Sequence, residues 1–401
     1  MKKLLVAVLV LMSSSFAMAE RTKIQGDLSV NGHFQFRTES AQNRQNVQGS
    51  KQMEQSFSRL RVYFQFTPNE NLTFNYTPQA TKGFGAVVDS ETTSGSTNHT
   101  EVTSFESNID YKISDNLSAK LGRQELSYGD HLFIGSLPWA NAGRSFDAVK
   151  LHHKLSNGWV DLLHSKISNN DTDISSEQDD KDLYLLYSSI NFDSAVKLLD
   201  LYLLHQNDNT ASDLEVNMVG FRLKGEVGAF FFRTENGKQT GENLDDEAYQ
   251  YDLELGGKFG KYSAAVEYSI AGKDYQQLYP TAHKFMGITD VLGRRNLQQT
   301  ALHIKGAPLD YMNFSLDMHQ FQRVDDENPA YKLNGSTSWG TTGDSTDIGS
   351  EVDLVVNFVS KDQIKLQLGY GVFTPGEYMK ENNSDLDDQV VFTYAMVNAN
   401  F

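Results

Sequence analysis

The chain has 401 residues, of which 39% are hydrophobic, and its mean hydropathy is −0.47. This low value excludes a polytopic helical membrane protein, whose spans would each need about 20 mostly apolar residues. Because the chain has no cysteine, disulfide scaffolds, thiolate metal sites and cysteine nucleophiles are also excluded. The net charge of −17 argues against nucleic acid as a partner, since no basic surplus is present to neutralise phosphates.

The first residues have the pattern of an export signal. Two lysines precede an apolar stretch over residues 4–12, and Ala17-Met18-Ala19 forms a small-residue cleavage pattern. The apolar stretch is too short to cross a bilayer as a helix. We therefore predict a cleaved signal peptide over residues 1–19 and a single exported domain over residues 20–401; a retained anchor helix is the alternative.

The rest of the chain alternates with a period of two residues, which is the pattern of β-strands with two different faces. Between Ser58 and Phe66, Leu60 and Val62 lie on one face, and Arg59 and Arg61 lie on the other. The same alternation recurs along the chain. The predicted strands are about ten residues long, which is the length that a tilted strand needs to cross a membrane.

The connections between these strands fall into two alternating classes. Eight are short and turn-like, and they lie near residues 68–71, 114–116, 156–158, 193–194, 224–226, 260–261, 308–310 and 360–362. Nine are longer and polar, and they lie near residues 40–55, 89–101, 124–145, 168–181, 205–214, 235–246, 273–296, 325–346 and 374–387. Short periplasmic turns opposite long extracellular loops are typical of bacterial outer-membrane barrels. The sequence therefore predicts an all-β fold, a closed antiparallel transmembrane β-barrel of about 18 strands. A multi-domain β-sandwich protein is the alternative.

The C-terminal segment supports an outer-membrane location. Val391, Thr393, Ala395, Val397 and Ala399 alternate up to a terminal Phe401. A final amphipathic strand that ends on an aromatic residue resembles the signal that the barrel-assembly machinery reads. We expect this machinery, outer-membrane lipid and lipopolysaccharide as partners, and the cell outer membrane as the location.

A barrel of this size encloses a water-filled pore, so the charged residues on its inner face should set selectivity. Strand parity predicts these inward bases: His33, Arg37, Arg59, Arg61, Lys150, Arg222, Lys224 and Arg233, with Arg144 at the outer end of a strand. It predicts these inward acids: Glu106, Asp110, Asp252, Glu254, Glu267, Asp317, Glu351 and Asp353. The clustered arginines favour carboxylate recognition, because a guanidinium can donate two parallel hydrogen bonds. The alternative is that the charges only solvate a wet wall and pair with one another.

Several motifs resemble the alginate-export family of outer-membrane proteins. They are LGRQELSYGD over residues 121–130, IGS over 134–136, GRSFDAV over 143–149, RLR over 59–61, DIGSEVDL over 347–354 and GYGVFTPG over 369–376. This resemblance implies an 18-stranded barrel with an electropositive constriction that passes an anionic polyuronate. Carried over by position, it implies that the constriction arginines are Arg37, Arg59, Arg61, Arg123 and Arg144; parity adds Lys150.

Two of the long loops have the length to fold into the pore. They cover residues 124–145 and 273–296, and the second contains Arg294 and Arg295. We predict that they gate the channel. Other loops carry acidic clusters that could bind Ca²⁺, although solvated loop charge is the alternative: Asp171, Asp173, Glu177, Asp179 and Asp180; Asp245, Asp246 and Glu247; Asp325, Asp326 and Glu327; Asp385, Asp387 and Asp388. No other cofactor or metal is predicted.

The sequence does not predict an enzyme. A membrane-embedded Ser–His pair must share one face of a strand, whereas His164 and Ser165 are adjacent and point to opposite faces. We predict a channel for the passive passage of anionic solutes such as an acidic sugar, an oligosaccharide or a polyuronate like alginate. A general, weakly selective porin is the first alternative. A non-conducting barrel that acts as an adhesin or receptor through its loops is the second.

Overall fold

The computed structural model describes residues 26–43, 52–84, 101–169, 180–209, 214–242, 244, 248–340, 343–360, 364–382 and 388–401. The predicted signal peptide, residues 1–19, lies outside these residues. The chain forms eighteen strands, with these bounds: β1 Asp27–Gln42, β2 Gln52–Asn69, β3 Leu72–Gly83, β4 Glu101–Lys112, β5 Leu117–Gln124, β6 Phe146–Leu155, β7 Gly158–Asn169, β8 Asp180–Asn191, β9 Val196–Asp208, β10 Leu214–Val227, β11 Phe230–Thr240, β12 Tyr249–Phe259, β13 Tyr262–Ala271, β14 Leu297–Leu309, β15 Met312–Gln322, β16 Asp347–Val359, β17 Ile364–Pro375 and β18 Val390–Asn400.

The sheet closes on itself. Each strand pairs antiparallel with the next strand in the sequence, and β18 pairs with β1. At the end of this seam Gly32 N donates to Phe401 O at 2.7 Å, and Phe401 N donates to Gly32 O at 3.0 Å. The predicted closed antiparallel barrel of eighteen strands is confirmed. In the described part of the chain no helix is long and apolar enough to cross a membrane.

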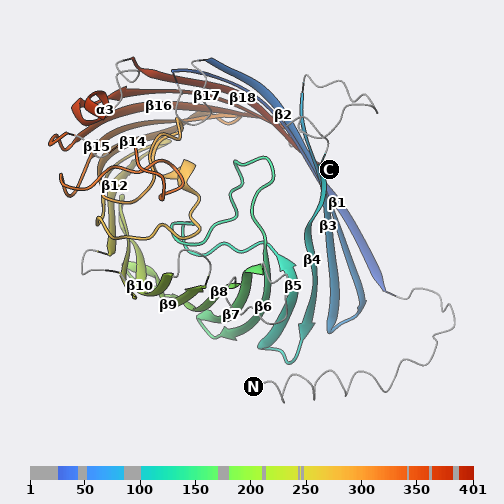
Figure 1. Cartoon of the computed structure of the whole chain (residues 1–401). Coiled ribbons are helices and arrows are strands. Elements are labelled where there is room, and N and C mark those ends of the chain that lie inside the picture. Colours follow the sequence, from blue (N-terminus) through green and yellow to red (C-terminus); the bar gives the residue numbers. More distant parts are fainter. Residues whose placement is uncertain are drawn as a thin grey trace, which may run out of the picture.

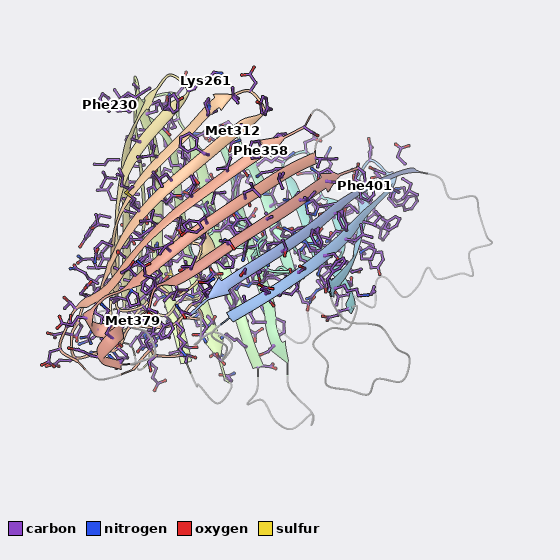
Figure 2. All side chains as sticks on the ribbon, turned by 90° about the horizontal axis from the view of Figure 1, so that it is seen from above. Phe230, Lys261, Met312, Phe358, Met379 and Phe401 are labelled. Carbon is purple, nitrogen blue, oxygen red and sulfur yellow. The ribbon has the colours of Figure 1, made fainter. Side chains whose placement is uncertain are left out.

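The two ends of the barrel differ in the length of their connections. Figure 2 shows Phe230, Lys261 and Phe401 at the end with the short turns and Met379 at the opposite end. Seven of the eight predicted short turns lie where two strands connect, as between β12 and β13 or between β14 and β15. The turn predicted at 224–226 is misplaced: these residues belong to β10, where the register shifts between Lys224 and Gly225, and the chain turns at Gly228 and Ala229 instead. Met379 belongs to a short helix, α3 (Glu377–Asn382), in the loop before β18. The alternation of short and long connections therefore places the long loops on one side of the membrane.

The period of two sorts side chains between lipid and lumen. On β2, Leu60 and Phe64 are exposed on the outer surface, whereas Arg59 and Arg61 are buried inside. On β9, Leu201 and Leu203 are exposed, whereas Tyr202 and Leu204 are buried. Because successive side chains on a strand point to opposite faces, each strand presents an apolar row to lipid and a separate row to the interior.

Two long loops fold into the barrel and contribute to its core. We call them loop A, residues 125–145 between β5 and β6, and loop B, residues 272–296 between β13 and β14, which contains the short 3-10 helix η1 (Ala282–Lys284). Both lie inside the ring of strands (Figure 1). Buried apolar residues of both loops belong to one hydrophobic cluster with inward residues of the wall. The predicted inward folding of these two loops is confirmed.

Candidate functional site

Three arginines of the barrel wall hold the tip of loop A. Arg37 on β1 donates to Trp139 O at 2.5 Å, and Arg59 on β2 donates to Ala140 O at 2.9 Å. Arg61, also on β2, donates to Ala142 O at 3.3 Å. Since β1 and β2 are adjacent strands with a fixed register, they present these guanidinium groups in a row along the loop. The structure therefore brings together three of the arginines that the sequence predicts.

Arg144, the fourth predicted arginine, joins loop A to loop B. Its Nη1 donates to Gly135 O at 3.0 Å within loop A and to Tyr279 O at 2.5 Å in loop B. Burial lowers the pKa of Arg144 to about 10, while the nearby Tyr279 opposes that change. The side chain therefore stays protonated at neutral pH.

Most of these arginines have no carboxylate partner in direct contact, although Glu125 lies near enough to attract Arg59 and Arg61. Only Arg37 pairs with a carboxylate, Glu39, at 3.2 Å. Among the described residues, Arg59, Arg61 and Arg144 form no ion pair, and their hydrogen bonds to the loop go to uncharged carbonyl oxygens. Arg59 and Arg61 are only 4% and 6% exposed. On this side of the lumen four guanidinium groups therefore have one carboxylate in direct contact, Glu39.

The two loops are also joined along their backbones. Ile134 and Tyr279 form an isolated parallel bridge, in which Tyr279 N donates to Phe133 O at 2.9 Å and Gly135 N donates to Tyr279 O at 2.8 Å. These contacts make loops A and B one connected structure across the lumen.

Acidic residues of β16, which is separated from β1 by β17 and β18, hold loop B. Glu351 on β16 accepts hydrogen bonds from the backbone N and the hydroxyl of Thr289, at 2.8 and 2.5 Å. Asp353, two residues further along β16, accepts from Ile288 N at 3.1 Å. Both carboxylates are 1% exposed. Thus the arginines hold loop A and the carboxylates hold loop B.

Three acids on β12 and β13 converge on one arginine of β11. Arg233 on β11 contacts Asp252 at 3.0 Å, Glu254 at 2.8 Å and Glu267 at 2.7 Å. One guanidinium therefore offsets only part of the negative charge of these three carboxylates.

The structure contradicts the prediction for Arg123. On β5, Arg123 has the same parity as Leu121, which is 57% exposed on the outer surface, whereas Gln124 is buried inside. Arg123 pairs with Asp147 at 3.0 Å, and both side chains are exposed. Arg123 therefore lies on the outer face of the barrel and does not belong to the constriction.

The other predicted site residues lie apart from the arginine row. Lys150 faces the lumen and approaches Asp161 at 3.8 Å. In loop B, Arg294 approaches Asp252 at 3.7 Å, and Arg295 donates to Lys273 O at 2.9 Å. These contacts fix both loop arginines to their surroundings, and the gating role of loop B stays a prediction.

Parity missed the charged residues that loops A and B add to the lumen, because their direction depends on the folded loops. Asp130 of loop A pairs with Arg222 and Lys224 at 2.9 and 2.7 Å. Lys284 of loop B donates to Asp130 O at 3.0 Å. In the sequence, only the charged side chains of Asp130 and Lys284 indicated that these residues could contribute to the lumen.

With this geometry in place, comparison with known proteins decides the family. Residues 26–392 match the family described as "Alginate export". The chain belongs to the alginate export family. This membership makes it a porin-like barrel of the bacterial outer membrane, as the sequence predicts. The comparison with curated proteins gives no match.

Solved structures place this alginate export family member among outer-membrane porins by fold. A BenF-like porin from Pseudomonas fluorescens Pf-5 has a TM-score of 0.67 at 7% identity, covering 94% of this chain and 100% of that one. OccAB1 from Acinetobacter baumannii has a TM-score of 0.65 at 12% identity, covering 96% and 99%. OccK5 from Pseudomonas aeruginosa has a TM-score of 0.62 at 9% identity, covering 93% and 98%. At these identities the likeness concerns the barrel fold alone.

The acidic loop clusters remain candidates for Ca²⁺ only by sequence. Most of their members, such as Asp171, Asp246 and Asp385, lie outside the described residues. Asp325 contacts Lys273 at 3.1 Å. In the described segments no group of three or more His, Asp or Glu residues is arranged to hold a metal ion.

Proposed function

We propose that the barrel is a channel for the passive passage of anionic solutes, such as an acidic sugar, an oligosaccharide or a polyuronate like alginate. The observation that carries this proposal is the pairing of Arg59, Arg61 and Arg144 with carbonyl oxygens and not with carboxylates. These guanidinium groups keep their net charge inside a narrow, low-dielectric passage, where they attract an anion more strongly than surface charges do.

The contacts to loop A also fix where this charge lies. A free arginine would lose side-chain entropy on meeting a solute, whereas Arg59 and Arg61 are already held by the loop. Preorganised positive charge of this kind favours entry of anions and exclusion of cations.

A solute-flux experiment tests the proposal. We would reconstitute the protein in liposomes and compare the uptake of short oligouronates with that of neutral oligosaccharides of equal length. We expect faster uptake of the oligouronates, and loss of this preference in the Arg59→Gln/Arg61→Gln variant. Arg123→Gln, which removes a cation from the outer face, is the matched control and should behave as wild type. Equal uptake of both classes by the wild type would reject the proposal.

The runner-up function is a general, weakly selective porin. The inward acids Glu254, Glu267 and Asp317 favour it, because a lumen with both signs of charge admits many polar solutes. A non-conducting adhesin or receptor would show no flux of either class. We also propose that the protein is not an enzyme, and that its β18 strand engages the barrel-assembly machinery during insertion.

A further inference from the structure

The lumen contains a cavity that the predicted constriction arginines do not line. It has a volume of about 340 Å³ and lies between loop B and the inner faces of β10 to β16. A wider cavity of about 930 Å³ reaches the short turns, and Lys224, Lys305 and Ser315 line both cavities. The smaller cavity is within the range of small-molecule sites, and the wider one connects it to the short-turn end of the barrel.

Three lysines form the basic part of the smaller cavity. Lys224 comes from β10, Lys284 from loop B and Lys305 from β14. Lys305 is exposed and forms no ion pair with the described residues. Lys284 is exposed to the lumen, yet enclosure by the barrel lowers its pKa; Asp130 opposes this effect, and Arg233 and Lys224 add to it. An anion placed between Lys284 and Lys305 would offset this accumulation of positive charge.

The opposite part of the cavity presents hydrogen-bond acceptors. Asp317 on β15 is the next inward residue after Ser315, which faces Lys305 across the strand pair. His303 holds its Oδ1 at 2.6 Å, and the Asp317 side chain is 19% exposed. The neighbouring Asp353 is 2% exposed and holds loop B. Asp317 is therefore the carboxylate of this pair that remains open to the cavity.

The other acids around the cavity are already occupied. Asp130 pairs with Lys224 at 2.7 Å, and Arg233 binds Glu254 and Glu267 at 2.8 and 2.7 Å. Apart from the buried Asp353, the groups that face the cavity without a Lys or Arg ion-pair partner in the described residues are thus the ammonium groups of Lys284 and Lys305 and the carboxylate of Asp317, of which His303 binds Oδ1.

We infer that this cavity is a solute-binding subsite for a small carboxylate that also carries hydrogen-bond donors. Lys284 and Lys305 bind the carboxylate, and Asp317, oriented by His303, accepts hydrogen bonds from the donors. The donors are hydroxyls in a sugar acid or an ammonium in an amino acid. The inference rests on the proposed function, namely that anionic solutes traverse the lumen, and it adds a second point of selection beyond the arginine row.

Solute-induced current noise in planar bilayers tests this subsite. We would determine the half-saturating concentration for four probes: glucuronate, glycine, glucose and acetate. We expect glucuronate or glycine to bind about tenfold more tightly than both glucose and acetate, because only glucuronate and glycine can contact both the lysines and Asp317. A charge-assisted hydrogen bond contributes about a factor of ten in binding. The better of the two probes identifies the source of the donors. Equal half-saturating concentrations for all four would overturn the inference.

Matched variants distinguish the contribution of the lysines from that of Asp317. Lys305→Gln, which removes no hydrogen bond or ion pair with the described residues, should weaken the binding of glucuronate and acetate by about tenfold and leave the binding of glucose unchanged. Asp317→Asn should weaken the binding of the best probe and leave the binding of acetate unchanged. Lys258→Gln, in the wider cavity only, is the control and should match the wild type. Unaltered binding in both Lys305→Gln and Asp317→Asn overturns the subsite.

The inference and the proposed function fail in different ways. If the wild type prefers anions in flux but Lys305→Gln and Asp317→Asn bind all probes as the wild type does, the subsite is wrong and the proposed function stands. If the wild type shows no anion preference in flux, the proposed function is wrong whatever the probes show.

Discussion

The indole of Trp139 in loop A stacks on the imidazole of His283 in loop B, with ring centroids 4.0 Å apart and ring planes 10° from parallel. The guanidinium of Arg37 lies 3.9 Å from the centroid of the same indole, and His283 Nδ1 is 2.9 Å from Asp290 Oδ1. This stack connects the wall strand β1 to both loops. It explains how two loops from distant parts of the sequence can restrict the lumen as one unit.

Loss of the stack should loosen this unit. His283→Ala removes an aromatic pair worth about 1 kcal/mol and a hydrogen bond of about the same value. We expect noisier single-channel currents with more frequent steps to higher conductance. His283→Phe keeps the ring and should lie closer to the wild type. Indistinguishable traces from wild type and His283→Ala would show that the stack does not connect the loops mechanically.

A methyl group at position 143 should disturb the arginine row without changing any charge. Gly143 has φ of +68°, and a Cβ there would lie 2.5 Å from Arg61 Nη2. We expect Gly143→Ala to displace Arg61 or loop A and to reduce anion preference, with a backbone cost of about 1–2 kcal/mol.

Gly228→Ala is the control for this variant, because Gly228 has a similar φ of +62° but nothing within 4 Å of the added Cβ. Both variants would be compared by reversal potential in a salt gradient. A matching loss of selectivity in the two variants would attribute the effect to backbone strain and contradict the role of Arg61.

Release of loop B from β16 should expose a buried methionine. Met286 is 1% exposed, and the chain has no cysteine, so Met286→Cys provides a single thiol for labelling. Glu351→Leu leaves the Thr289 N–H without its acceptor, at a cost of about 1–3 kcal/mol. We expect labelling of Met286→Cys to be about tenfold faster in this background.

Two comparisons make the labelling experiment specific. Glu351→Gln keeps an acceptor oxygen and should give an intermediate rate. Glu226→Leu removes an exposed acid at the short-turn end and should leave the rate unchanged. Slow labelling in the Glu351→Leu background would mean that other contacts suffice to hold loop B.

The anchor at the base of loop A should withstand acid. Burial alone would raise the pKa of Asp130, but hydrogen bonds and charges from Arg222 and Lys224 outweigh it and hold that pKa well below its usual range. A carboxyl whose pKa is lowered by folding stabilises the folded protein at pH values above its pKa in the unfolded chain, which is about 3.9. This stabilisation is lost as the pH falls toward the pKa of the carboxyl in the folded protein.

The test compares the wild type with Asp130→Asn over a range of pH. We expect the difference in their thermal unfolding temperatures to stay constant from pH 8 to about pH 5 and to shrink only below about pH 4. Titrating groups that do not interact with Asp130 affect both proteins equally and cancel in the difference. A difference that already shrinks between pH 7 and pH 5 would refute the lowered pKa.

The barrel itself could be predicted from the sequence because its signals are local. Alternation in segments such as residues 58–66 fixes which face meets lipid, and turns such as Gly260-Lys261 fix where strands end. The same parity would have placed Arg123 correctly, since it shares a face with the lipid-exposed Leu121. The resemblance of the surrounding motif favoured the lumen instead, and that was the source of the error.

The candidate site could be predicted only in part. Wall residues such as Arg59 follow from strand parity, but the direction of loop residues such as Lys284 depends on contacts distant in the sequence. The bridge between Ile134 and Tyr279 and the bond from Thr289 to Glu351 exist only once the barrel has closed. No periodicity in the sequence encodes them, so the shape of the constriction had to come from the structure.

The reversal potential in a salt gradient across a planar bilayer tests the central claim most directly. Arg59, Arg61 and Arg144 bind carbonyl oxygens and no carboxylate in the described residues. We therefore predict that the wild-type channel prefers anions, that Arg59→Gln/Arg61→Gln weakens or abolishes this preference, and that Arg123→Gln leaves it unchanged. A cation-selective wild-type channel, or an equal effect of Arg123→Gln, would contradict the assignment of selectivity to the arginines that hold loop A.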